Sequence, residues 1–205
     1  MSKIKLITLL GEQFNINGDQ GNLLVLQKRL AWLGFESEIL SVSSSAELFG
    51  ATGHFVLLGH GSLAANKSAA SSWPSMAEDF ITATKTLPGL AVGSGASKVA
   101  TSAGLHLKQL AEPVSEFATE HLNEFELLGY KFADAQPAVT HQVNNAIVTW
   151  MHGPLLAKNP ELADAMIRRI LTAAGITAPE SLSNENTRKI DEILAGVWQL
   201  EKPQN

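Results

Sequence analysis

A histidine at the end of an apolar stretch is the side chain best placed for acid–base chemistry. Residues 146–150, AIVTW, are mostly β-branched or aromatic and predict a buried strand. His152 follows this strand, in a turn made with Gly153 and Pro154. An imidazole at a rigid strand end can transfer protons near neutral pH. The sequence therefore indicates a candidate general base at His152, although a purely structural, hydrogen-bonded histidine fits the same position.

A helix is predicted directly after this turn, from Pro160 to about Ala174. Apolar residues recur there at helical spacing, at Leu162, Met166, Ile167 and Ile170. Asn159 is predicted to cap the helix, and Pro160 suits its first position because no amide donor is needed there. The strand, the turn with His152 and this helix form one unit, which holds the histidine at the edge of a sheet.

A second candidate position lies in a glycine-rich turn. Residues 90–92 predict a strand, Gly93, Ser94 and Gly95 a sharp turn, and a helix follows from near Ala96 to Gly104. This arrangement is typical of a nucleophile elbow, in which a strained turn lifts one side chain to the top of the sheet at a helix N-terminus. Ser94 is therefore an alternative nucleophile.

A third turn carries candidate oxyanion or substrate contacts. The apolar run 55–58 predicts a strand buried on both faces, and it ends in Gly59, His60 and Gly61. The carboxyl ends of strands in a doubly wound sheet face a ligand crevice. A glycine there allows a backbone amide to approach a developing oxyanion. Gly59, His60, Gly61 and Gly95 are the candidate substrate or oxyanion residues.

Composition excludes several classes of function. The 205 residues carry a net charge of −5 with no basic run, which argues against nucleic acid as a partner. The absence of cysteine excludes disulfides, thiolate metal sites and a thiol nucleophile. The six histidines lack zinc-ligand spacing, so no metal and no cofactor are expected. With no apolar run near 20 residues, we expect no membrane span and a cytoplasmic location.

Alternation of strands and helices predicts an α/β fold with one mostly parallel, doubly wound sheet. Residues 1–205 are expected to form one domain, with a C-terminal helical extension from about residue 176. The remaining expected strands are 4–10, 36–42, 125–128 and 138–143. Three more helices are expected. The first is capped by Asp19 or Asn22 and ends at Leu33, the second begins at Pro74, and the third is capped by Ser183 or Asn184.

Two further segments carry expectations of their own. Residues 64–73 are small and polar and predict a mobile loop. The last helix has an apolar stripe of Ile190, Ile193, Leu194, Val197 and Leu200, with Trp198 beside it. Packing on its own domain is the expected use of this stripe, with docking of a partner as the alternative.

The segment from Trp150 to Asp164, WMHGPLLAKNPELAD, resembles the catalytic-histidine segment of class I glutamine amidotransferases. The similarity is to their cobyric-acid-synthase-like branch, and most of all to GatD-like glutaminase subunits. The branch pattern is Tyr-Leu-His-Gly-Pro-Leu-Leu-Pro-Lys-Asn-Pro-Glu-Leu-Ala-Asp, from which this chain differs at Trp150, Met151 and Ala157. The resemblance implies a three-layer, flavodoxin-like fold and His152 as the general base for a cysteine nucleophile. It also implies a Mur-ligase-like (MurT-type) partner in amidation of the peptidoglycan precursor lipid II, with glutamine or another small molecule as ligand.

The same resemblance places a glycine where the family has its nucleophile. The family pattern Leu-(Gly or Ala)-Ile-Cys-Gly-Gly-Tyr-Gln puts cysteine at Gly93. The family's Leu-Gly-Gly-Gly-Gln-Asp turn is changed at His60, Ser62 and Leu63. The glycine-rich loop Gly18-Asp19-Gln20-Gly21-Asn22 resembles another family signature.

Three hypotheses for function follow. The favoured one is a degenerate, GatD-like subunit without glutaminase activity, because glycine cannot act as a nucleophile. The second is a serine hydrolase that uses Ser94 and His152. The third is a non-catalytic binding or regulatory protein.

Overall fold

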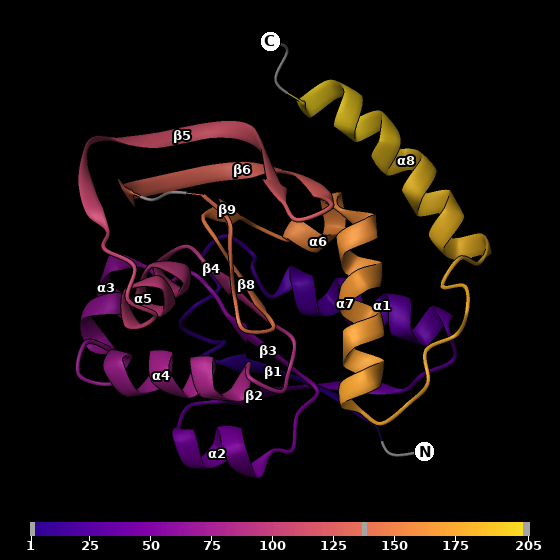
Figure 1. Cartoon of the computed structure of the whole chain (residues 1–205), viewed down its shortest axis with the longest axis horizontal. Helices are drawn as coiled ribbons and strands as arrows, with labels where there is room; N and C mark the ends of the chain where they lie inside the picture. Colours follow the sequence, from indigo (N-terminus) through magenta and orange to yellow (C-terminus); the bar gives the residue numbers. More distant parts are fainter. Residues whose placement is uncertain (1–2, 137–138, 203–205) are drawn as a thin grey trace.

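A six-stranded sheet forms the centre of the computed structural model, which describes residues 3–136 and 139–202 (Figure 1). The strand order is β2-β1-β3-β4-β8-β7. All neighbouring pairs are parallel except the edge pair β7·β8. The strands are β1 (Ile4–Leu9), β2 (Ser37–Val42), β3 (Phe55–Leu58), β4 (Gly89–Val92), β7 (His141–Val143) and β8 (Ala146–Thr149). The predicted mostly parallel, doubly wound sheet is confirmed.

Helices cover both faces of this sheet and complete a three-layer α/β fold. Apolar residues of one core join the sheet to α1 (Gly21–Trp32), α6 (Leu155–Lys158) and α7 (Pro160–Ala173). A second core joins the opposite face to α2 (Ser45–Gly50), α3 (Leu63–Ser68), α4 (Trp73–Ala83) and α5 (Ser94–Ser102). Every residue of β3, β4 and β8 is buried, as expected of parallel strands covered on both sides.

A second, antiparallel sheet lies beside the carboxyl end of β8. It has the order β5-β6-β9 and consists of β5 (Lys108–Leu122), β6 (Phe125–Gln136) and β9 (Met151–His152). Tyr130 of β6 is paired with His152, so this sheet directly borders the candidate base. The predicted strand 125–128 is only the start of β6. The predicted strand 138–143 is observed at 141–143, and Ala138 lies outside the described residues.

Several predicted local features are wrong. Residues 63–68 form α3 instead of a loop, because Ser62 Oγ accepts a hydrogen bond from the amide of Ala65 and caps a helix there. Asp19 and Asn22 do not cap α1, whose N-cap residue is Gln20. Asn159 lies at the N-cap position of α7 as predicted, but its side chain makes no capping hydrogen bond. Each of these three side chains makes hydrogen bonds to more distant segments.

Helix α8 (Glu185–Glu201) runs along the outside of the molecule (Figure 1). Asn184 caps it in a capping box with Thr187, as predicted for this residue. The apolar stripe is packed on the domain only in part: Ile190, Ile193 and Leu200 are 38%, 64% and 86% exposed, whereas Leu194 and Val197 are half-buried. Polar contacts also hold the helix, including an ion pair of Asp191 with the buried Arg29 at 2.5 Å.

Candidate functional site

The turn between β4 and α5 has the geometry of a nucleophile elbow. Gly93 has φ 56° and ψ −117°, a left-handed conformation that a residue with a Cβ rarely adopts. Helix α5 begins at Ser94, two residues earlier than predicted. A Cβ on Gly95 would lie 2.7 Å from the carbonyl oxygen of Leu58 and 2.8 Å from that of Gly59. Glycine at position 95 therefore lets the start of α5 pack directly on the end of β3.

The imidazole of His60 occupies the space that a side chain at the elbow would need. A Cβ on Gly93 would lie 2.5 Å from His60 Nδ1 and 2.5 Å from His152 Cε1. The amide of Ser94 donates a hydrogen bond to His60 Nδ1 at 3.0 Å. Because an amide only donates, this ring nitrogen is unprotonated. Burial lowers the pKa of His60, in keeping with a neutral ring, against an opposing effect of Asp134.

Three amides beside the elbow donate within the chain. The amide of Gly61 donates to Ser94 Oγ at 3.0 Å, and that of His60 donates to Asp19 Oδ2 at 2.7 Å. The amide of Ser94 donates to His60, so three candidate donors for an oxyanion already have acceptors. An incoming carbonyl oxygen would have to displace one of these contacts.

Both ring nitrogens of His152 are also hydrogen-bonded. Nε2 lies 3.2 Å from the carbonyl oxygen of Phe132, and Nδ1 lies 2.7 Å from Asn17 Nδ2. A carbonyl oxygen accepts, so Nε2 carries the proton and Nδ1 accepts from Asn17. Burial, followed by the charge of the neighbouring His60, lowers the pKa of His152 to about 4. His152 is therefore neutral at pH 7, with no ring nitrogen directed at the elbow.

Ser94 and His152 line one cavity of about 510 Å³ together with His60 and Gly93. The two imidazole rings meet edge to face, with centroids 4.7 Å apart. Within the described part of the chain, no hydrogen bond joins Ser94 to His152. The structure thus brings together all three candidate turns, but it does not arrange Ser94 and His152 as a hydrogen-bonded nucleophile and base.

Asp19 joins the loops of the two histidines. Its side chain is fully buried, and it accepts the amide of His60 with one oxygen and the amide of Gly153, at 3.1 Å, with the other. Burial raises the pKa of Asp19 to about 6, against the lowering effect of both amides. Asn22 extends this junction by donating to the carbonyl of Gly153.

The role of Asp19 was missed because its partners lie 41 and 134 positions away in the sequence. The loop Gly18-Asp19-Gln20-Gly21-Asn22 was the only sequence signal that could have found it.

An aromatic wall from β6 was also missed. Phe132 and Tyr130, both partly exposed, line a neighbouring cavity of about 440 Å³ together with Ser115 and His152. Residues 105–145 carried too weak a pattern to predict it. No group of three or more histidine and carboxylate side chains that could hold a metal is found in residues 3–136 and 139–202. No helix among those residues is long and apolar enough to cross a membrane.

Comparisons with known proteins identify the fold. No family model matches the sequence, and no curated protein is similar to it. Among solved structures, a protein from Thermoplasma acidophilum whose name is that of a GMP synthase subunit superposes with a TM-score of 0.52. It is 14% identical, with 94% of this chain and 99% of that chain covered.

Two further structures give the same result. A glutamine amidotransferase from Thermotoga maritima has a TM-score of 0.51 at 12% identity, covering 97% of this chain and 96% of its own. The glutaminase domain of Trypanosoma brucei CTPS, solved with bound acivicin, has a TM-score of 0.55 at 9% identity, covering 90% and 99%. The chain therefore has a fold like that of class I glutamine amidotransferases.

Proposed function

We propose that this chain is a glutamine-amidotransferase-fold subunit that does not hydrolyse glutamine and acts as a binding subunit of a partner synthase. The observation that carries the proposal is the position of His60. Its ring fills the space beside Gly93 where a nucleophilic side chain would lie, and it accepts the amide of Ser94.

Hydrolysis of glutamine requires three things that this site lacks. A nucleophile must attack the carbonyl carbon, but Gly93 has no side chain. Free amides must stabilise the oxyanion, but those of Ser94 and Gly61 already donate to side chains. A base needs an available nitrogen, but both nitrogens of His152 are bonded. Loss of a nucleophile alone typically costs about 10⁴- to 10⁶-fold in rate.

The test is an assay of glutamate release from glutamine by the purified chain. We expect no release above that of a His152→Ala variant at pH 7. Steady-state release that disappears in His152→Ala would disprove the absence of glutaminase activity.

A second assay, with a p-nitrophenyl ester as substrate, compares the wild type with the His152→Ala and Ser94→Ala variants. Ester hydrolysis by the wild type that is lost in both Ser94→Ala and His152→Ala would support the serine hydrolase. The structure does not favour this alternative, because Ser94 and His152 are not hydrogen-bonded to each other.

For the partner we propose a Mur-ligase-like protein, with a role for the complex in amidation of lipid II. Support comes from the resemblance of residues 152–164 to GatD-like subunits. Two solved structures of similar fold also carry the names of a glutaminase domain and of one component of a synthase. In this proposal the chain is one cytoplasmic domain with a helical extension from about residue 176. Its cavity at His60 binds glutamine or another small molecule.

Co-expression of the chain with a Mur-ligase-like protein encoded beside it tests this partner. A stable complex should elute as one peak in size-exclusion chromatography. Two separate peaks would contradict the proposed partner without changing the prediction about glutamine hydrolysis.

A further inference from the structure

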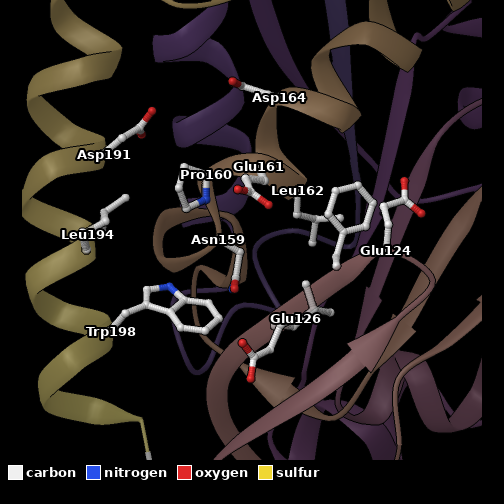
Figure 2. A pocket seen from close by; sticks show the side chains of 13 residues that line it. Glu124, Glu126, Asn159, Pro160, Glu161, Leu162, Asp164, Asp191, Leu194 and Trp198 are labelled. Atoms are coloured by element: carbon white, nitrogen blue, oxygen red, sulfur yellow. The ribbon is translucent and has the colours of Figure 1, made fainter.

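A groove separates α8 from the body of the protein (Figure 2). Its volume is about 530 Å³. Leu194 and Trp198 of α8 form one side, and the start of α7 with the start of β6 forms the other. The groove is therefore bounded by three separate elements.

Polar contacts hold α8 at both ends of this groove. Toward its N-terminal end, Asp191 pairs with Arg29, which also binds Asp164. Near its C-terminal end, Glu201 pairs with Lys158, and the Trp198 indole donates to the carbonyl of Lys158. Between these contacts, the half-buried Leu194 and Trp198 line the groove, whose open volume leaves room for another chain.

The lining of the groove combines apolar surface with negative charge. Seven of its residues are apolar: Phe125, Leu127, Pro160, Leu162, Leu194, Ala195 and Trp198. Five are carboxylates: Glu124, Glu126, Glu161, Asp164 and Asp191. None of the lining residues is Lys, Arg or His. The groove thus offers apolar contact with acidic groups around it.

Two of these carboxylates have no cationic partner in the described part of the chain. Glu126 pairs with Lys202, and the two aspartates share Arg29. Glu124 and Glu161 are exposed and form no ion pair there. They remain able to bind cations of an incoming chain.

We propose that this groove binds a basic, amphipathic segment of a partner protein. Its apolar side chains would pack between α8 and the start of β6, and its lysines or arginines would face Glu124 and Glu161. Charge complementarity selects this occupant, because acidic walls repel nucleic acid and anionic lipid. A second copy of this chain, with net charge −5, is disfavoured for the same reason.

This inference does not depend on the identity of the synthase proposed above. The exposed stripe at Ile193 and Leu200 lies on the same helix, so a partner docked in the groove has further apolar surface within reach.

The test uses a fluorescein-labelled, 14-residue peptide of leucine and lysine with helical spacing as the probe. We expect saturable binding to the whole chain, and weaker binding as salt is raised. A matched peptide of leucine and glutamate should not bind. Failure of the lysine peptide to bind, or equal binding of both peptides, would overturn the proposal.

Two double variants with the same change in net charge locate the site. Glu124→Lys with Glu161→Lys should weaken binding by about 10-fold or more, which corresponds to about 1.4 kcal/mol. Glu78→Lys with Glu192→Lys alters exposed residues outside the groove and is the control. Equal weakening in both would mean non-specific attraction to an acidic protein, and would overturn the groove as the site.

A variant without charge change separates the groove from its charge. Ala195 is exposed on α8 and lines the groove, so Ala195→Trp should fill the groove. This variant should weaken binding about as much as the double glutamate variant. Circular dichroism confirms that each variant is folded. In ¹⁵N NMR spectra, the probe should shift the Trp198 indole signal and leave that of the buried Trp150 unchanged. Dimerisation of the chain that is lost in the Glu124 and Glu161 variant would identify a second copy as the occupant, contrary to the proposal.

Discussion

The imidazole of His60 fills the space beside Gly93 at the elbow. The resemblance to amidotransferase motifs places Gly93 at the nucleophile position, but it gives no indication that an imidazole fills the space beside this glycine. The contact joins the ends of β3 and β4, which lie more than 30 residues apart in the chain. Local sequence patterns do not predict that a side chain from one strand end will fill a space at another strand end.

Gly93→Cys should therefore give a crowded, slowly reacting thiol. Its Cβ would overlap His60, and its positive φ would be strained, with a cost of about 1 to 3 kcal/mol for the backbone alone. Adding His60→Gly removes the overlap with His60, leaves the contact with His152 Cε1, and frees the amide of Ser94. Because the thiol would then lie at the N-terminus of α5, which favours the thiolate, we expect the double variant to react with iodoacetamide about 10-fold faster than the single variant.

Mass spectrometry of alkylated protein measures both rates, and Ser102→Cys on the exposed end of α5 gives the rate of an uncrowded thiol. Equal rates for the single and double variants would show that His60 does not obstruct the elbow.

The sequence predicted the elements of the central sheet better than their connections. Continuous apolar runs identified β3 (Phe55–Leu58) to the residue and β4 to within one residue, because parallel strands are buried on both faces. The hairpin of β5 and β6 was missed since most of β5 is exposed and polar, so its hydrophobic pattern is weak. The aromatic wall of the site could not be predicted for the same reason, because it comes from β6 of this hairpin.

Two asparagines illustrate why local sequence rules succeed at one helix and fail at another. Asn184 caps α8, and its side chain contacts only residues up to three positions away. Asn159 was predicted as a similar cap. Its buried amide instead binds the N–H and C=O of Leu128 and the C=O of Leu155, and so ties β6 to α6.

Asn159→Ala should consequently cost more stability than Asn184→Ala. Removing Asn159 leaves buried backbone groups of Leu128 and Leu155 without partners, and we expect the free energy of unfolding to fall by about 3 kcal/mol. Loss of the half-buried cap at Asn184 should cost about 1 kcal/mol. Urea unfolding at pH 7 measures both values. Equal losses would mean that Asn159 acts as no more than a cap.

At the scale of the whole molecule, two groups at the junction of the loops give opposite pH dependences of stability. Burial raises the pKa of Asp19 from 3.8 to about 6, so the native state binds more protons than the unfolded state in this window. Stability from Asp19 is therefore lost as pH rises from about 4 to 6. Burial lowers the pKa of His152 from 6.5 to about 4, so its contribution is present above pH 6.5 and is lost as pH falls.

The pH dependences of stability from Asp19 and His152 oppose each other in the wild type, and Asp19→Asn should separate them. With the carboxyl removed, only the histidine terms remain at this junction, since His60 also has a lowered pKa. The difference in unfolding free energy, variant minus wild type, should therefore become more positive by up to about 3 kcal/mol between pH 4 and pH 6.5. Using this difference cancels the other carboxyl groups, which titrate alike in both proteins. Urea unfolding at half-unit pH intervals provides the curves, and His152→Asn should change the difference in the opposite direction. Parallel curves for Asp19→Asn and wild type would show that Asp19 keeps an ordinary pKa and that its burial between the two loops has no energetic consequence.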